Sequence, residues 1–361
     1  MAKIKKDSSS DNSKKDLLSS QKSSKKIEEK SKKKSGLSKI AKIVILCSIV
    51  LIVFGLAFLI FGRVRVIDNS MESTIAKDET IWFNRFATPD YSDLVVYHHP
   101  ETDSIVSSAK DKNYYKMCRM YGPKWVSKSQ VIYQKMNKRP IYVSRCVAKP
   151  GDIVEIVDNT ILVNKKKVNN LITTKKSFFV VNNGLINPNV LDTIGIAKSD
   201  MTGEVDYAED FLSIYKNKIQ SNNIAIYCLN DLTANKLSQY SVIKHVDPVV
   251  LPKKHFEPTV YPYSKEEAWN ESNFGPLLIP KANKVLKLNK RVANFYRRVI
   301  EVYEGNKFEI VGDDIIINDQ KVNSYRFKQD YYFVIGDNRT SKNDSRFFGF
   351  VPEDHIVGVA Y

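Results

Sequence analysis

The stretch that decides the fold lies near the far end of the chain: Gly336-Asp337-Asn338-Arg339-Thr340-Ser341-Lys342-Asn343-Asp344-Ser345-Arg346. A second short stretch, Ser70-Met71-Glu72-Ser73-Thr74-Ile75, stands just after a long apolar segment. A serine hydroxyl becomes an effective nucleophile when a neighbouring base takes its proton. A lysine can be that base when burial disfavours its ammonium form. The two stretches contain the residue types of such a pair, which needs no histidine.

The apolar segment before Ser70 predicts a membrane anchor. Ile43 to Gly62 are 20 residues without a charge, flanked by Lys42 and Arg63. That length fits one helix across a hydrocarbon core of roughly 30 Å. A cleavable leader is the alternative, but the preceding tail is long and Phe61-Gly62-Arg63-Val64-Arg65 lacks the small residues of a cleavage site. We therefore expect an uncleaved transmembrane helix over residues 43–62.

The formal charge of +16 is concentrated in the tail before the anchor. Residues 1–42 contain 14 lysines and 5 acidic residues, and we predict that this Ser/Lys-rich tail is disordered. Such a tail can be attracted to anionic membrane lipid, and the rest of the chain is too mildly basic to indicate a nucleic-acid partner. The lysine excess predicts that the amino terminus is cytoplasmic and that everything after Arg63 is extracytoplasmic.

Cysteine and histidine usage indicates no metal or cofactor. Cys118, Cys146 and Cys228 follow the anchor without a CxxC pair, so one disulfide is possible, with one thiol left over. The five histidines include one adjacent pair, His98-His99, and show no metal-ligand spacing. We expect neither a metal site nor a cofactor.

Short β-rich runs separated by Asn, Asp, Gly and Pro predict a mainly β, antiparallel fold. Helices are expected near Asp206–Ile219 and Leu232–Tyr240. Two runs, Ile153–Asn164 and Lys307–Asn318, resemble each other, and Asp158-Asn159 and Gly312-Asp313 have two-residue turn chemistry. We expect these hairpins to share a sheet. The predicted strands are Ile81–Phe86, Leu94–Tyr97, Ile141–Ala148, Ile153–Ile156, Ile161–Val163, Ile224–Cys228, Phe308–Val311, Ile315–Ile317 and Tyr331–Ile335.

Four local patterns that follow the anchor in order resemble the type I signal peptidases, a family of membrane-anchored Ser/Lys proteases. Ser70-Met71-x-x-Thr74-Ile75 resembles the nucleophile box, usually Ser-Met-x-Pro-Thr-Leu, and Ser92–Tyr97 resembles Gly-Asp-Ile-Val-Val-Phe. Tyr142–Asp152 resembles Tyr-x-Lys-Arg-x-x-Gly-x-Pro-Gly-Asp. Gly336–Arg346 resembles the terminal box, Gly-Asp-Asn-Arg-x-x-Ser-x-Asp-Ser-Arg. The resemblance covers roughly Ile43–Tyr361 apart from insertions, in a long-insert form.

The resemblance implies a membrane-bound serine endopeptidase that removes leader peptides from exported proteins. Ser70 would be the nucleophile, and its backbone N–H would help to hold the oxyanion. The substrate would lie extended beside strand edges, with small side chains in shallow apolar pockets. No cofactor is implied.

The two catalytic positions depart from the family pattern in a reciprocal way. Ser144 stands where the family has its lysine, and Lys342 stands where the terminal box has a serine that bonds that lysine. Because a lysine side chain reaches about 6 Å, Lys342 could act as the base from the opposite wall while Ser144 orients it. An inactive relative is the alternative. Lys149 is another candidate base, but its odd offset from position 144 points to the other strand face.

Asp68 is a second departure from the family, because some members have an oxyanion-donating serine at this position. An ionised aspartate would repel the oxyanion, so we expect Asp68 to point away, to be protonated or to be paired, with Arg65 nearby in sequence. Met71 is interpreted as an apolar wall beside the nucleophile. The remaining residues are interpreted as an ion-paired scaffold of the site: Arg145, Asp337, Asp344 and Arg346.

These patterns predict a division of the chain and a set of partners. The catalytic β domain is expected over residues 63–152 and 331–361, around an inserted β-rich subdomain at 153–330 whose polar part runs from Val168 to Arg291. The expected partners are signal peptides of secreted preproteins and membrane lipid, with the secretion translocon as a further candidate and no nucleic acid. The expected location is the cytoplasmic membrane. A non-catalytic relative that binds exported polypeptides is the main alternative, and a self-cleaving regulator is disfavoured by the anchor.

Overall fold

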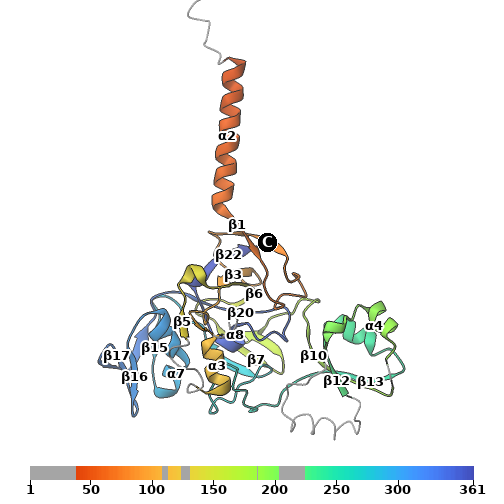
Figure 1. The fold of residues 1–361 in the computed structure, drawn as a ribbon. Coiled ribbons are helices and arrows are strands. Elements are labelled where there is room, and N and C mark those ends of the chain that lie inside the picture. Colours follow the sequence, from red (N-terminus) through yellow and green to blue (C-terminus); the bar gives the residue numbers. More distant parts are fainter. Residues whose placement is uncertain (1–37, 108–112, 123–130, 185, 203–223) are drawn as a thin grey trace, which may run out of the picture. The chain divides into compact units, whose positions relative to one another are not determined.

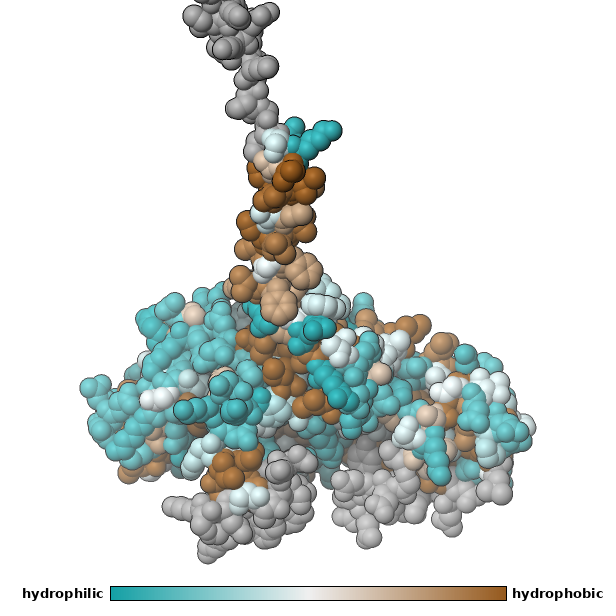
Figure 2. Space-filling view, turned by 45° about the horizontal axis from the view of Figure 1, so that its top comes forward, coloured by the Kyte–Doolittle hydropathy of each residue, from teal (hydrophilic) through white to brown (hydrophobic). Residues whose placement is uncertain are grey.

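The computed structural model describes residues 38–107, 113–122, 131–184, 186–202 and 224–361. The apolar segment forms one helix, α2 (Lys39–Ile60), none of whose residues is buried. Its 22 residues extend about 33 Å, and apolar side chains cover its surface (Figure 2). This helix is long and apolar enough to cross a membrane, so it fits a single-pass anchor. The predicted disordered tail falls almost entirely in residues 1–37, outside the described residues.

The compact unit from Ile60 to Tyr361 is built on a seven-stranded sheet. Neighbouring strands in this sheet are antiparallel, and Figure 1 shows β22, β3, β6 and β20 one after another. The predicted mainly β, antiparallel fold is confirmed. In sheet order the strands are β1 (Phe61–Arg65), β2 (Thr80–Asn84), β22 (Ile356–Ala360), β3 (Leu94–His98), β6 (Ile141–Ala148), β20 (Tyr331–Ile335) and β21 (Val351–Pro352).

Smaller sheets and short helices complete the described part of this unit. One sheet has β14 (Phe274–Leu278), β7 (Ile153–Val157), β8 (Thr160–Val163) and β9 (Lys166–Lys167); another has β11 (Met201–Thr202), β12 (Ile224–Leu229), β10 (Lys176–Asn182) and β13 (Ile243–Pro248). The others join β16 (Phe308–Val311), β17 (Asp314–Ile317) and β18 (Gln320–Val322), β15 (Val285–Lys287) and β19 (Ser324–Arg326), and β4 (Ser104–Val106) and β5 (Val131–Tyr133). The helices are α3 (Tyr114–Tyr121), α4 (Pro188–Ile194), α6 (Asp231–Leu237), α7 (Lys290–Arg298) with the π-helical η4 (Val299–Tyr303), α8 (Ser345–Phe348), and the 3₁₀ turns η2 (Met136–Lys138), η3 (Lys198–Asp200) and η5 (Glu353–His355).

The two similar hairpins form as predicted but do not share a sheet. Asp158 and Asn159 both have positive φ, which a two-residue hairpin turn requires, and Gly312 does so at the other turn. However, β7–β8 pairs with β14, whereas β16–β17 pairs with β18. The expectation of one common sheet is therefore wrong, because each hairpin finds its own third strand.

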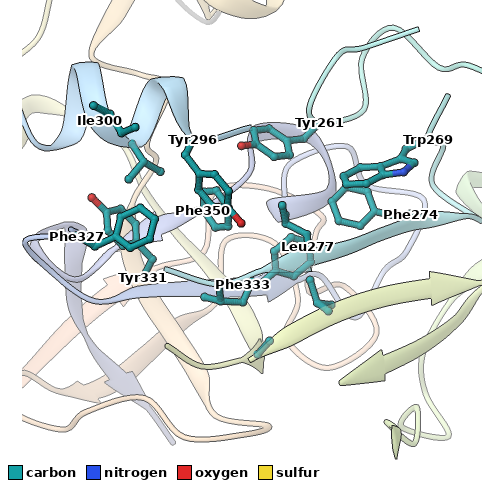
Figure 3. Packing of buried hydrophobic residues seen from close by; sticks show 14 of the residues in the cluster. Tyr261, Trp269, Phe274, Leu277, Tyr296, Ile300, Phe327, Tyr331, Phe333 and Phe350 are labelled. Atoms are coloured by element: carbon teal, nitrogen blue, oxygen red, sulfur yellow. The ribbon is translucent and has the colours of Figure 1, made fainter. Parts of the chain in front are cut away.

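The largest hydrophobic core contains residues from strands before and after Asp152, where the first part of the catalytic domain is expected to end. Val147 and Ala148 of β6 and Phe333 of β20 share it with β7, β8, β14 and α7. Figure 3 shows its aromatic centre, where the rings of Tyr296 and Phe350 stack with centroids 5.6 Å apart. This packing holds β6, which carries Ser144, and β20, which leads into the terminal box.

Candidate functional site

The segment that carries Ser70 is a loop between β1 and β2. Val66, Met71 and Ile75 are buried in one hydrophobic cluster with residues of these strands. The N–H groups of Thr74 and Ile75 both bond the carbonyl of Met71, at 2.8 and 2.7 Å, so the chain turns sharply after Ser70. Apolar anchors on both sides therefore hold the Ser70 side chain, which is fully buried.

The terminal box closes directly onto this loop. The N–H of Asn338 donates to the carbonyl of Ser70 at 2.9 Å, and its side-chain amide donates to the carbonyl of Asn69 at 3.1 Å. Thr74 donates its hydroxyl to Asp337 Oδ2 at 2.6 Å. Two stretches that are far apart in the sequence, the Ser70 loop and the terminal box, thus lie in direct contact.

Buried ion pairs brace the terminal box. Arg145 on β6 holds Asp337 through two bonds, Nε–Oδ1 at 2.8 Å and Nη2–Oδ2 at 2.6 Å. Asp344 caps the N-terminus of α8 by accepting from the N–H of Arg346, and it also accepts from the N–H of Gly336. The guanidinium of Arg346 lies 2.8 Å from the same carboxylate. Because each of these charged side chains has an oppositely charged partner, their arrangement fits a structural scaffold for the site.

The hydroxyl of Ser70 points at a carboxylate. Its Oγ donates to Asp68 Oδ1 at 2.8 Å and lies 3.4 Å from the carbonyl oxygen of Val143. The other oxygen of Asp68 accepts from the Asn343 side-chain amide at 3.2 Å. Arg65, the nearby candidate partner, pairs with Asp78 at 3.0 Å instead. Asp68 therefore faces the Ser70 hydroxyl and is not paired with Arg65.

Ser144 is buried beside Ser70 but bonds a residue that sequence reasoning did not single out. It lies on β6 opposite Val95, and its Oγ is 3.1 Å from the hydroxyl of Tyr97 on β3. Burial raises the pKa of Tyr97 well above its ordinary value, and the nearby carboxylate of Asp68 adds to the rise. Tyr97 is therefore a neutral phenol close to both Ser144 and Asp68.

Lys342 extends towards carboxylates in the segment between β13 and β14. Its Nζ lies 3.3 Å from Glu257 Oε1, and its side chain is 37% exposed. Thr259 donates its hydroxyl to the same Glu257 oxygen at 3.1 Å. Burial, together with repulsion from Glu257, raises the pKa of the neighbouring Glu271 to about 7. The ammonium of Lys342 thus has a carboxylate counterion in this arrangement.

A cavity of about 650 Å³ lies beside this arrangement. Lys342 and Asn343 line one part of it, and Tyr142, Phe347 and Phe348 contribute apolar surface. Ile67, one residue before Asp68, also lines it. Through Ile67, the cavity adjoins the loop that carries Ser70.

Comparison with known proteins identifies the family to which this arrangement belongs. The sequence pattern described as signal peptidase, peptidase S26, matches residues 39–186 and 230–361. The chain belongs to the peptidase S26 signal peptidases. Signal peptidase I from Aquifex aeolicus (strain VF5) is 61% identical over 31 residues, which are 9% of this chain and 12% of the relative. This match covers about one eighth of that protein's length.

The structure brings some of the predicted site residues together and places others in different contacts. Ser70, Met71 and the terminal box converge, and Ser144 lies within the same buried region. Lys342 lies on the terminal box but pairs with Glu257, and Lys149 pairs with Asp90 at 2.7 Å. Sequence reasoning missed three residues with side chains at the site: Tyr97, Glu257 and Asn343. Tyr97 could have been noticed, because it replaces a phenylalanine in the resembled pattern and adds a hydroxyl.

Proposed function

We propose that this signal peptidase is a membrane-bound serine endopeptidase that removes N-terminal signal peptides from exported preproteins. The observation that carries the proposal is the closure of the terminal box on the Ser70 loop, through the bond from Asn338 N–H to the Ser70 carbonyl. A polar cluster of this kind around a buried serine suits nucleophilic catalysis more than a passive core. Membership of the peptidase S26 family supports the same reaction.

The anchor gives the proposed enzyme its location. With α2 in the cytoplasmic membrane and the lysine-rich tail on the cytoplasmic side, the domain after Arg63 would face the outer side. Signal peptides of secreted preproteins would reach it at the membrane surface, with the secretion translocon as a candidate neighbour. Neither a cofactor nor nucleic acid enters the proposal.

In the proposed reaction, Ser70 Oγ attacks the scissile carbonyl and the N–H of Ser70 helps to hold the oxyanion. Lys342 is the proposed general base, with Ser144 as its orienting partner. This assignment requires the Lys342 side chain to rotate away from Glu257 and Ser144 to exchange its bond with Tyr97. Substrate that enters the cavity beside Lys342 would cause both side chains to move.

The alternative is a non-catalytic relative that binds or scaffolds exported polypeptides with the same groove. The pairs Lys342–Glu257 and Ser144–Tyr97 favour it, because they engage the proposed base and its proposed orienting residue in other contacts. The two proposals differ in one measurable property, the hydrolysis of a preprotein.

The test uses the full-length protein in detergent micelles with a model preprotein and without added metal. We expect cleavage by the parent, loss of cleavage in Ser70→Ala, and a fall of at least 100-fold in Lys342→Met. Lys290→Met is the matched control, because Lys290 is 57% exposed and lies 3.8 Å from Asp313. Cleavage by Ser70→Ala would refute the nucleophile, and undiminished cleavage by Lys342→Met would refute the base. Binding of a signal peptide without cleavage would support the scaffold.

A reciprocal variant tests the exchange of positions. Ser144→Lys combined with Lys342→Ser should retain cleavage within about tenfold of the parent if either wall can present the lysine. If the parent is inactive and the double variant cleaves, the parent protein is the scaffold. The double variant then has the catalytic arrangement that is usual in the family.

A further inference from the structure

Asp68 occupies the centre of the site, although the family resemblance gives it no role in proton transfer. One of its oxygens accepts the Ser70 hydroxyl at 2.8 Å and the other accepts the Asn343 amide at 3.2 Å. Asn343 therefore fixes the carboxylate so that one oxygen faces the nucleophile. That distance lies within the range in which a general base can remove a proton directly.

Three other basic side chains that could accept a proton contact other groups. Lys342 pairs with Glu257 and Lys149 with Asp90. The ring of His99 packs against Tyr142 and Phe348, and burial lowers its pKa to about 4. The second oxygen near Ser70 Oγ is the carbonyl of Val143, which is not a useful base. Among the described residues, Asp68 is thus the carboxylate that accepts from the Ser70 hydroxyl, and it is the candidate proton acceptor.

We propose that Asp68 is a further catalytic residue, which accepts the Ser70 proton directly as the acyl-enzyme forms. The inference rests on the proposed function in one respect, that Ser70 is the nucleophile. It replaces Lys342 by Asp68 as the base for acylation, and it keeps Lys342 as the acid for the leaving amine and the base for the hydrolytic water. The Oγ–H bond breaks as the Oγ–C bond to the scissile carbonyl forms, and the proton moves to Asp68 Oδ1. The peptide C–N bond then breaks, and the leaving amine takes a proton from the Lys342 ammonium.

The second half of the cycle restores both groups. Neutral Lys342 acts as the general base for the hydrolytic water and becomes an ammonium again. The hydroxide attacks the acyl carbon, the ester C–Oγ bond breaks, and Ser70 recovers its proton from Asp68. This division lets Lys342 start as the charged partner of Glu257, which is the state its ion pair indicates.

The proposal also removes an electrostatic conflict. A charged aspartate two residues before the nucleophile would repel the oxyanion of the tetrahedral intermediate. Once Asp68 holds the Ser70 proton it is neutral, so the repulsion disappears at the step in which the oxyanion forms. The negative charge moves from Asp68 to the substrate oxygen, and no second charge is added to the site.

A fluorophosphonate probe tests the proton acceptor without a peptide substrate, because it reacts with an activated serine hydroxyl and releases fluoride. The full-length protein, Asp68→Asn and Asp68→Glu would be labelled in detergent and the Ser70 peptide quantified by mass spectrometry. We expect Asp68→Asn, which keeps the shape but not the basicity, to slow labelling at least 100-fold. Asp68→Glu should recover part of the rate, which a purely structural role would not predict.

Asp78→Asn is the matched control, since Asp78 is 57% exposed and pairs with Arg65 outside the site. Labelling of Asp68→Asn within threefold of the parent would overturn the proposal, as would a parent in which Ser70 is not labelled. An equal unfolding temperature for parent and Asp68→Asn would exclude loss of fold. Labelling that depends on Asp68 without any preprotein cleavage would refute the proposed function and leave this inference standing.

Discussion

Gly336 packs directly against the backbone of Ser70. A Cβ on Gly336 would lie 2.6 Å from the Ser70 carbonyl oxygen and 3.3 Å from the Ser70 Cβ. Real Cβ atoms do not approach a backbone oxygen so closely, so no other residue fits without moving the loop. The first residue of the terminal box thus has to be a glycine for the Ser70 loop to keep its position.

Gly336→Ala should therefore displace Ser70 and impair the site. We expect a loss of roughly 1–3 kcal/mol in unfolding free energy from overpacking, together with a fall in fluorophosphonate labelling of at least tenfold. Gly184→Ala is the control, because the nearest atom to its new Cβ would be Val242 Cγ2 at 3.8 Å. Equal labelling of the two variants would show that the close contact has no catalytic consequence.

The ion pair between Arg145 and Asp337 should contribute strongly to stability. Asp337 is 2% exposed and Arg145 is 17% exposed, so Asp337→Asn leaves a largely buried guanidinium without its counterion. We expect unfolding free energy to fall by roughly 3 kcal/mol. In the exposed pair Lys290–Asp313, the change Asp313→Asn should cost less than about 0.5 kcal/mol. Denaturant titration of both variants in detergent makes the comparison, and equal losses would contradict it.

Glu271 should make stability depend on pH. Burial and the charge of Glu257 raise its pKa from 4.5 to about 7, against the opposing attraction of Arg346 and Lys342 and with a further rise from Asp344. Between these pH values the folded protein keeps a proton that the unfolded chain has lost. The free energy of unfolding therefore falls as pH rises from about 4.5 to 7.

Glu271→Gln should remove this fall, with a gain over the parent of roughly 2–3 kcal/mol at pH 7.5 and little gain at pH 4.5. Unfolding curves at pH 5, 6, 7 and 8 measure the difference. Glu266→Gln, which changes an exposed side chain in the same segment, should leave the parent profile unchanged. A pH-independent effect of Glu271→Gln would contradict the prediction.

Tyr97 should make a lysine at position 144 destabilising. Its hydroxyl is 3.1 Å from Ser144 Oγ, so a longer side chain there has to pass or displace it. We expect Ser144→Lys alone to cost roughly 1–3 kcal/mol and Tyr97→Phe to recover part of that loss. A double-mutant cycle measures the coupling. Tyr332→Phe, in the same hydrophobic cluster as Tyr97, serves as control and should show no coupling.

Much of the fold could be predicted because strand signals are local. Three predicted strands, Ile141–Ala148, Phe308–Val311 and Tyr331–Ile335, have the observed bounds, and the other six overlap observed strands within a few residues. The predicted helix at Leu232–Tyr240 forms as Asp231–Leu237. The predicted helix at Asp206–Ile219 lies outside the described residues.

From the sequence, the segment before the second hairpin had no assigned structure. Tyr296–Ile300 belongs to α7 and η4. Asn289, which caps α7 through the N–H of Val292, was the available signal. Ala293, Tyr296 and Ile300 are buried at helical spacing, so tertiary packing outweighed strand propensity.

The site was less predictable than the fold, because its polar contacts join distant parts of the chain. The Ser70 loop and the terminal box could be paired from their motifs, but the partner of Lys342 lies 85 positions away and has no motif. The direction in which Asp68 points depends on Asn343, 275 positions later. Only the assembled fold reveals such contacts.

The contact between the Ser70 loop and the terminal box also has a consequence for biogenesis. Thr74 and Asp337 are 263 positions apart, so almost the whole unit from Ile60 to Tyr361 is synthesised before the Ser70 loop acquires this contact. A nascent chain that has emerged only as far as β19 contains Ser70 and its apolar anchors but lacks Gly336 and Asn338, which contact the Ser70 backbone. The Ser70 site is therefore completed only when the terminal box has been synthesised, and a shorter nascent chain lacks it.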